Sequence, residues 1–151
     1  MRLSFVLLLC AGVAQADPLF TPVAVPHHQY DGGWEHFVGG GLTAFDCNGD
    51  GRTDLAAAGG STPAAVFVNE SDGDIRLRME TLPVSDSTGV YALDINNDGH
   101  LDLMMLRVGP DQIWLGDGAC GFAPADIIAF ADKWTTAFSA TWEPSQTRPT
   151  L

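Results

Sequence analysis

The segment Ala44-Phe-Asp-Cys-Asn-Gly-Asp-Gly-Arg-Thr-Asp-Leu55 decides the fold, because it returns 48 residues later as Ala92-Leu-Asp-Ile-Asn-Asn-Asp-Gly-His-Leu-Asp-Leu103. A weaker similarity links residues 66–69 with residues 113–116, and each of these segments runs into a turn rich in Asp and Gly. A further step of 48 places residues 140–151 on the same pattern, but Trp142, Pro144 and Gln146 replace the loop's Asp, Asn and Asp there. The chain therefore contains two full copies of one unit and part of a third.

Each unit is predicted to form about four short β-strands separated by turns. In the first unit, residues 39–45 lead into the acidic loop and residues 54–58 leave it. Residues 65–68 form the next apolar run, and residues 75–79 alternate between polar and apolar side chains as an edge strand does. Residues 124–131 fit a helix or a strand. About four strands in a unit of this length are typical of a β-propeller blade, so we expect an all-β chain of such blades.

The unit length and the N-terminal sequence together predict the domain organisation. We expect a signal peptide at 1–16, a leader segment at 17–32, blade 1 at 33–82, blade 2 at 83–130 and a partial, degenerate blade 3 at 131–151. The 135 residues after the signal peptide (151 − 16) make about 2.8 units. Propellers close with roughly 4–8 blades, so the propeller is incomplete. It is a fragment of a longer one, a short chain that self-associates, or a structural remnant with unpaired strand edges.

The two acidic loops follow the pattern Asp-x-Asn-x-Asp-Gly-x-x-Asp, in which alternate side chains can converge on one cation. Glycine at position six permits the tight bend that this convergence requires. Carboxylate, amide and main-chain oxygens make a hard shell that suits Ca²⁺. The predicted ligands are the side chains of Asp46, Asn48, Asp50 and Asp54 with the carbonyl of Arg52, and the side chains of Asp94, Asn96, Asp98 and Asp102 with the carbonyl of His100.

Two other interpretations of these loops were weighed. An EF-hand requires a bidentate Glu at position twelve between two helices, whereas position twelve is Ala57 or Met105 here and strand-like residues follow. Asx-rich turns without metal are the second alternative, since Asp, Asn and Gly favour tight turns by themselves. Repetition of every ligand position in a second copy favours calcium.

The first 16 residues have the parts of a secretory signal peptide, namely Arg2, an apolar run and the small-x-small end Ala14-Gln15-Ala16. The apolar run is shorter than the roughly 20 residues that span a bilayer, and no other segment is apolar for long enough to be a membrane anchor. We therefore expect export to the periplasm, the cell surface or the medium. In such an oxidising compartment Cys47 and Cys120 either form a disulfide or stay as buried thiols.

The composition bounds the partners. The chain has 19 acidic and 7 basic residues, for a net charge of −12. Such a surface repels a phosphate backbone, so nucleic acid is an unfavourable partner. With 46% apolar residues and 17% charged residues, the chain has enough apolar side chains for an ordered core.

The motif Asp-x-Asn-x-Asp-Gly-x-x-Asp-Leu, repeated at blade spacing over about residues 33–130, resembles the FG-GAP/VCBS repeat family. These are the calcium-loop β-propellers of integrin α-chain heads and of many exported bacterial proteins. The resemblance implies Ca²⁺ at the blade hairpins and ligand or partner binding on the propeller face. We therefore expect a non-catalytic binding or adhesion module for a protein or glycan. The alternative is the scaffold portion of a secreted hydrolase or lyase whose active site lies outside this chain.

Aromatic residues, glycines and histidines outside the loops give further expectations. Trp34, Trp114, Trp134 and Trp142 could stack on sugars, but we expect them to pack between adjacent blades. The run Gly39-Gly-Gly41 predicts a strand start where two blades approach closely. The pair His27-His28 is expected to lie in a solvated leader instead of forming a transition-metal site.

Overall fold

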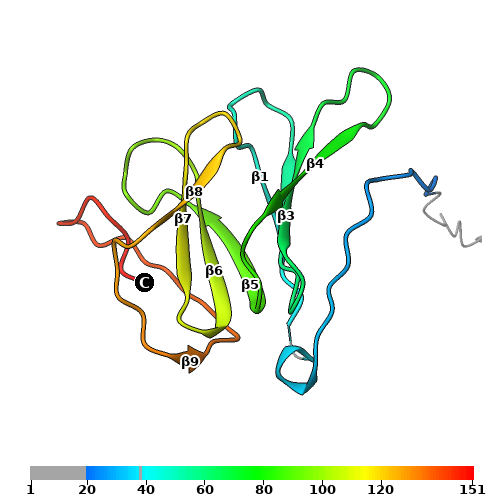
Figure 1. Cartoon of the computed structure of the whole chain (residues 1–151). Coiled ribbons are helices and arrows are strands. Elements are labelled where there is room, and N and C mark those ends of the chain that lie inside the picture. Colours follow the sequence, from blue (N-terminus) through cyan, green and yellow to red (C-terminus); the bar gives the residue numbers. More distant parts are fainter. Residues whose placement is uncertain (1–19, 38) are drawn as a thin grey trace, which may run out of the picture.

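The computed structural model describes residues 20–37 and 39–151. The predicted signal peptide at 1–16 lies outside the described residues. The described residues form two antiparallel sheets, drawn in Figure 1, and contain no α-helix, only the 3-10 turn η1 (Trp34–His36). The predicted all-β fold of blade-like sheets, incomplete as a propeller, is thus confirmed.

Each sheet is a meander of four strands in which consecutive strands pair. The first sheet consists of β1 (Leu42–Phe45), β2 (Asp54–Ala57), β3 (Ala64–Asn69) and β4 (Leu77–Leu82). The second consists of β5 (Ser87–Leu93), β6 (Asp102–Gly109), β7 (Gln112–Gly116) and β8 (Phe122–Ala125), and the short β9 (Lys133–Trp134) pairs with the end of β6. Residues 126–131 continue from β8 without helix, which resolves the ambiguous segment in favour of non-helical structure.

The sequence repeat is also a repeat of strand register. Phe45 pairs with Asp54 across the first acidic loop, and Leu93 pairs with Asp102 across the second. An isolated bridge joins Thr141 to Thr150, a further 48 positions on. The degenerate third copy therefore keeps the pairing of the first hairpin although it has lost the acidic side chains.

Strand burial follows the residue pattern. Five consecutive residues of β3, from Ala64 to Val68, are buried because both faces of this strand are covered. In β4 the first four residues alternate between half-buried and exposed. This agrees with the edge strand that the alternation of polar and apolar residues predicted. The observed strand begins at Leu77, two residues later than predicted, and Ile75 is exposed in the preceding turn.

The largest core lies between the two sheets, where β1 and β2 pack against β5. It contains Phe45, Val66, Val90, Leu103 and Trp114. A Cβ added to Gly41 would lie 2.9 Å from the Cα of Gly89, which confirms the predicted close approach of the blades. Fully buried Ser87 strengthens this contact, because its hydroxyl accepts a 2.9 Å hydrogen bond from the N–H of Gly59.

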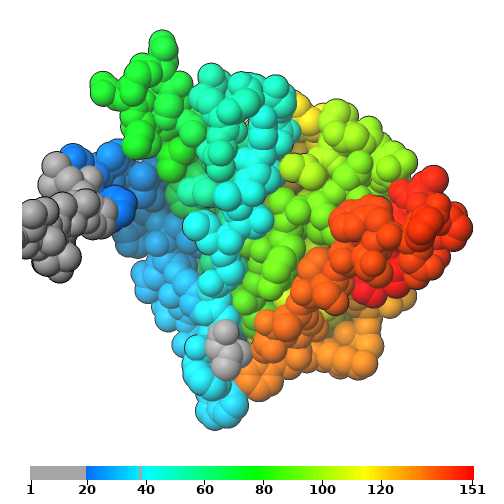
Figure 2. Space-filling view, turned by 180° about the vertical axis from the view of Figure 1, so that it is seen from behind, coloured from blue at the N-terminus to red at the C-terminus, as the bar shows by residue number. Residues whose placement is uncertain are grey.

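The outer faces of both sheets are covered by the ends of the described chain. Phe130 and Phe138 pack against the cluster of Leu93, Met104 and Ile113 on the second sheet, and Figure 2 shows this orange-to-red segment crossing the molecule. On the first sheet the ring of His28 meets Phe67 at 6.0 Å and bonds the carbonyl of Ala58. The expectation of a solvated leader is therefore wrong for His28, which is held by Phe67 and by the carbonyl of Ala58. His27 is exposed, as expected.

The four tryptophans differ in burial. Trp114 is buried between the sheets as predicted, but Trp34, Trp134 and Trp142 are 69%, 43% and 55% exposed, so the expectation of packing between blades is wrong for these three. They lie on segments outside the two four-stranded meanders, where no second blade covers them. Among the described residues, no helix has the length and apolar character needed to cross a membrane.

Candidate metal centre

Both acidic loops connect the first two strands of their sheets, β1 to β2 and β5 to β6, at the end of the molecule that also carries the β7–β8 turn (Figure 1). The strand pairs that close them, Phe45 with Asp54 and Leu93 with Asp102, fix eight residues in each connection. Both loops fold alike.

Position one of each loop organises the backbone. The carboxylate of Asp46 accepts hydrogen bonds from the N–H groups of Gly49 (2.8 Å) and Asp50 (3.2 Å) through Oδ1, and from Gly51 (2.8 Å) through Oδ2. Asp94 accepts the equivalent bonds from Asn97, Asp98 and Gly99 at 2.7, 3.2 and 3.0 Å. The Gly51 N–H, followed by further main-chain N–H groups, lowers the pKa of Asp46, so this side chain stays anionic in mild acid.

Positions three and five lie side by side. Asn48 donates from Nδ2 to Asp50 Oδ2 at 2.9 Å, and Asn96 donates to Asp98 Oδ2 at 2.7 Å. The main-chain N–H of His100 and the amide of Asn96 lower the pKa of Asp98. Each loop therefore gathers the side chains of positions one, three and five through hydrogen bonds to its own main chain and between Asn and Asp.

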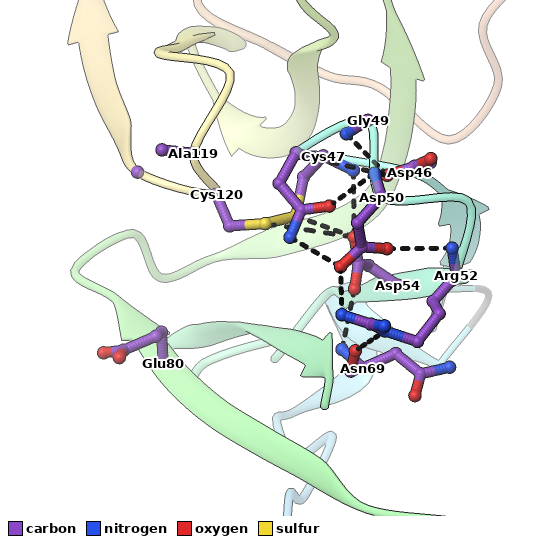
Figure 3. The surroundings of a disulfide bond; sticks show 12 residues. Asp46, Cys47, Gly49, Asp50, Arg52, Asp54, Asn69, Glu80, Ala119 and Cys120 are labelled. Atoms are coloured by element: carbon purple, nitrogen blue, oxygen red, sulfur yellow. Dashed lines mark hydrogen bonds and ion pairs between the residues drawn. A yellow bond between two sulfur atoms is a disulfide. The ribbon is translucent and has the colours of Figure 1, made fainter. Parts of the chain in front are cut away.

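Position seven differs between the loops. The N–H groups of Arg52 and His100 bond Asp50 and Asp98 in the same way, at 2.8 Å in each loop. The Arg52 guanidinium also forms a 2.6 Å ion pair with Asp50 and donates from Nε to the Asn69 carbonyl (Figure 3). The first loop thus carries a cationic side chain against one of its predicted ligands. The role of the Arg52 and His100 carbonyls as ligands stays a prediction.

Position nine points into the protein. Asp54 and Asp102 are fully buried, and both oxygens of each carboxylate accept main-chain hydrogen bonds. Asp54 accepts from Cys47 at 2.9 Å and from Asn69 at 2.7 Å. Asp102 accepts from Ile95 at 2.9 Å and from Gly116 at 3.0 Å, and burial raises its pKa. These two residues join each loop to the end of the third strand, a role that the ligand pattern did not reveal.

Binding of a metal would require the loop carboxylates to move closer together. Among the described residues, the only three His, Cys, Asp or Glu side chains with ligand atoms within 4.8 Å of one another are Cys47, Asp54 and Cys120. The two cysteines are joined in a disulfide and offer no thiolate. No three of the loop carboxylates come this close together, yet their all-oxygen chemistry fits a hard cation, and Oδ2 of Asp46 and Oδ2 of Asp94 each accept only one hydrogen bond at present. The residues present therefore fit Ca²⁺.

The disulfide links the two blades, as Figure 3 shows. Cys47 occupies position two of the first loop, and Cys120 lies in the β7–β8 turn, 73 residues later, with a Cα–Cα distance of 4.9 Å. This resolves the alternative left open by the sequence in favour of the bridge. Asp117 shapes the turn, because its Oδ1 accepts the N–H groups of Ala119 (2.7 Å) and Gly121 (2.9 Å) on either side of Cys120.

Four-stranded antiparallel sheets that repeat with an Asx-rich hairpin loop define a repeat protein of the propeller-blade class. Residues 46–105 match the family model described as FG-GAP-like repeat. The matched residues run from the first acidic loop to the second strand of the second sheet and include both loops. Comparison with curated proteins and with solved structures found no significant match.

Proposed function

We propose that the chain is an exported, calcium-binding and non-catalytic binding module of β-propeller type. The observation that carries the proposal is the common geometry of positions one, three and five in two loops 48 residues apart. Asp46, Asn48 and Asp50 would hold one ion, and Asp94, Asn96 and Asp98 the other, with Asp54 and Asp102 beneath them. Bound Ca²⁺ supplies the positive charge that balances the clustered carboxylates.

The loops themselves provide the oxygens and the rigidity. The main-chain bonds to Asp46 and Asp94 hold the backbone of each loop in its tight turn, so the rearrangement that binding requires is confined to the ligand side chains. Extracellular calcium modules bind with dissociation constants of about 10⁻⁴–10⁻³ M. At ten times such a constant, each occupied loop adds about 1.4 kcal/mol to the free energy of unfolding. Calcium is thus a structural ion in this proposal.

Thermal unfolding of the mature chain in Ca²⁺ and in EGTA tests the metal sites. We expect Ca²⁺ to raise Tm, and Asp50→Ala and Asp98→Ala each to remove about half of the increase. Asp72→Ala is the matched control, since Asp72 is an exposed acid in the β3–β4 turn outside both loops. An equal Tm in Ca²⁺ and EGTA, with no heat of Ca²⁺ binding, rejects the calcium sites.

Export is supported by the Cys47–Cys120 disulfide, because such bridges persist mainly in oxidising compartments. The mass of the protein recovered from the periplasm or medium tests this. We expect a mature chain that begins at Asp17 and carries no free thiol. An uncleaved, reduced protein confined to the cytosol rejects export.

The proposed activity is binding of a protein or glycan, with further blades or a second copy as additional partners. The first sheet supports the latter, since Leu55, Leu77 and Met79, which pack with Phe67 on its outer face, are only partly buried. Sedimentation of the mature chain tests self-association, and a single monomeric species across the micromolar range rejects it.

A further inference from the structure

A group of exposed aromatic side chains lies at the end of the molecule opposite the acidic loops, where η1 and β9 are drawn in Figure 1. The Trp34 ring meets Phe37 at a centroid distance of 5.0 Å and Trp134 at 5.3 Å. These residues are 69%, 70% and 43% exposed respectively. We call Trp34, Phe37 and Trp134 the aromatic cluster. Its members come from segments 100 residues apart in sequence, brought together by the pairing of β9 with β6.

A pocket of about 280 Å³ adjoins this cluster, and Phe37 lines it together with Tyr30, Asp31 and His36. The His36 side chain is 97% buried (3% exposed), but neither ring nitrogen has a hydrogen-bond partner. The nearest carboxylate oxygens are those of Glu35, 4.0 Å from Nδ1, and Asp86, 3.8 Å from Nε2, both beyond hydrogen-bonding distance. Buried polar groups without partners are rare, because each loses its hydrogen bonds to water and gains none in return. The imidazole therefore points to a ligand that supplies the missing partner.

Three chemical features select the ligand class. Exposed indole rings stack on flat apolar faces. An imidazole nitrogen is a donor or an acceptor according to its tautomer, and a hydroxyl satisfies either. The carboxylates of Asp31, Glu35 and Asp86 accept hydrogen bonds from hydroxyls but repel an anion. A quaternary ammonium would suit the rings but leave the His36 nitrogens unpaired.

From this combination we infer that the aromatic cluster and the adjoining His36 pocket form a binding site for a neutral saccharide. A sugar ring presents an apolar C–H face to the indoles and several hydroxyls to His36 and the carboxylates. The inference rests on the proposed function as a binding module and names its ligand class. The site lies away from the calcium loops, so the saccharide contacts neither ion.

Calorimetric titration of the mature chain in Ca²⁺ tests the inference, with cellotetraose, maltotetraose and chitotetraose as probes. We expect at least one saccharide to bind, and Trp34→Ala and Trp134→Ala each to raise its dissociation constant about tenfold, which corresponds to one lost stacking contact. Trp142→Ala is the matched control, because Trp142 is also exposed but outside the cluster; it should bind as the parent does. His36→Gln should weaken binding without changing the effect of Ca²⁺ on Tm.

A cationic probe and the variants distinguish a saccharide site from the other possible results. Tetramethylammonium is the cationic probe. Binding of tetramethylammonium but of no saccharide overturns the inference in favour of a cation site. Absence of binding by all probes, or equal losses in Trp34→Ala and Trp142→Ala, also overturns it. Because the Tm increase in Ca²⁺ is measured on the same samples, these outcomes are distinguished from failure of the calcium sites.

Discussion

The Asp54 carboxylate accepts a 2.7 Å hydrogen bond from the main-chain N–H of Asn69, 15 residues later, at the end of β3. Its other oxygen holds Cys47 in the acidic loop, so one side chain spans the loop and the third strand. Asp102 repeats the arrangement between Ile95 and Gly116 in the second sheet. The last acidic position of each loop is therefore part of the blade itself, whether or not an ion is bound.

Asp54→Ala is expected to destabilise the chain even in EGTA. The change leaves two main-chain N–H groups without their acceptor in a buried site, which costs about 3 kcal/mol or more. Asp50→Ala, at the exposed rim of the same loop, should cost less than about 1 kcal/mol under the same conditions. Urea unfolding in EGTA measures both, and an equal effect of the two substitutions would contradict the structural role of Asp54.

The paired substitution Cys47→Ser with Cys120→Ser should lower the free energy of unfolding by about 4 kcal/mol in the chain-entropy view of cross-links, given the 73-residue separation. The reason is that the bridge restricts the unfolded chain and also joins the two blades. Unfolding in EGTA of the oxidised parent and the double variant gives the difference. Fully reduced parent protein is the control and should match the variant; a loss below 1 kcal/mol in both would show that the bridge contributes little.

Much of the fold follows from the repeated segment. The spacing of Asp46 and Asp94 predicted two like blades, and the strand register repeats with that spacing. Cys47 and Cys120 were named as a pair, but whether they form a disulfide stayed open, because two cysteines 73 residues apart carry no periodic signal and only the packing of blade 2 beside blade 1 brings them together. The inward direction of Asp54 was also missed, since a ligand pattern assigns every acidic side chain to the ion.

The burial of two residues of the aromatic cluster was predicted wrongly. Trp34 and Trp134 were expected to pack between blades, because large apolar side chains usually find such cover. Their segments run outside the four-stranded meanders, and the pairing of β9 with the last residues of β6 brings the two indoles together in the open. Such a contact depends on where non-repeating segments dock, which a repeat pattern does not specify.

Arg52→Gln should raise the Ca²⁺ affinity of the first loop several-fold. The Arg52 guanidinium lies 2.6 Å from Asp50 Oδ2 and competes with an ion for that oxygen, and its charge repels the ion. The second loop has His100 at this position and should bind more tightly than the first in the parent. Calcium titration of each loop in an Asp98→Ala or Asp50→Ala background measures the two affinities.

Arg76→Gln is the control for the loss of one positive charge. Arg76 is exposed and pairs with Glu70 in the β3–β4 region, outside both loops in the sequence and without an ion pair to a predicted ligand. Its substitution should leave the affinity of the first loop within about twofold. Equal increases in Arg52→Gln and Arg76→Gln would indicate a general effect of net charge, in contradiction to direct competition at Asp50.

The Asp117 turn predicts a pH-dependent contribution to stability. Hydrogen bonds from the N–H groups of Ala119 and Gly121 lower the pKa of Asp117 below its ordinary 3.8. A carboxylate with a lowered pKa in the folded state stabilises that state above pH 3.8, and the contribution is lost as the pH falls through the folded pKa. Asp117→Asn should therefore destabilise the chain at pH 6, and the difference from the parent should shrink below pH 3.8. Urea unfolding in EGTA across pH 2–6 measures it, with Asp72→Asn as the exposed control, and a difference that grows toward low pH would contradict the assignment.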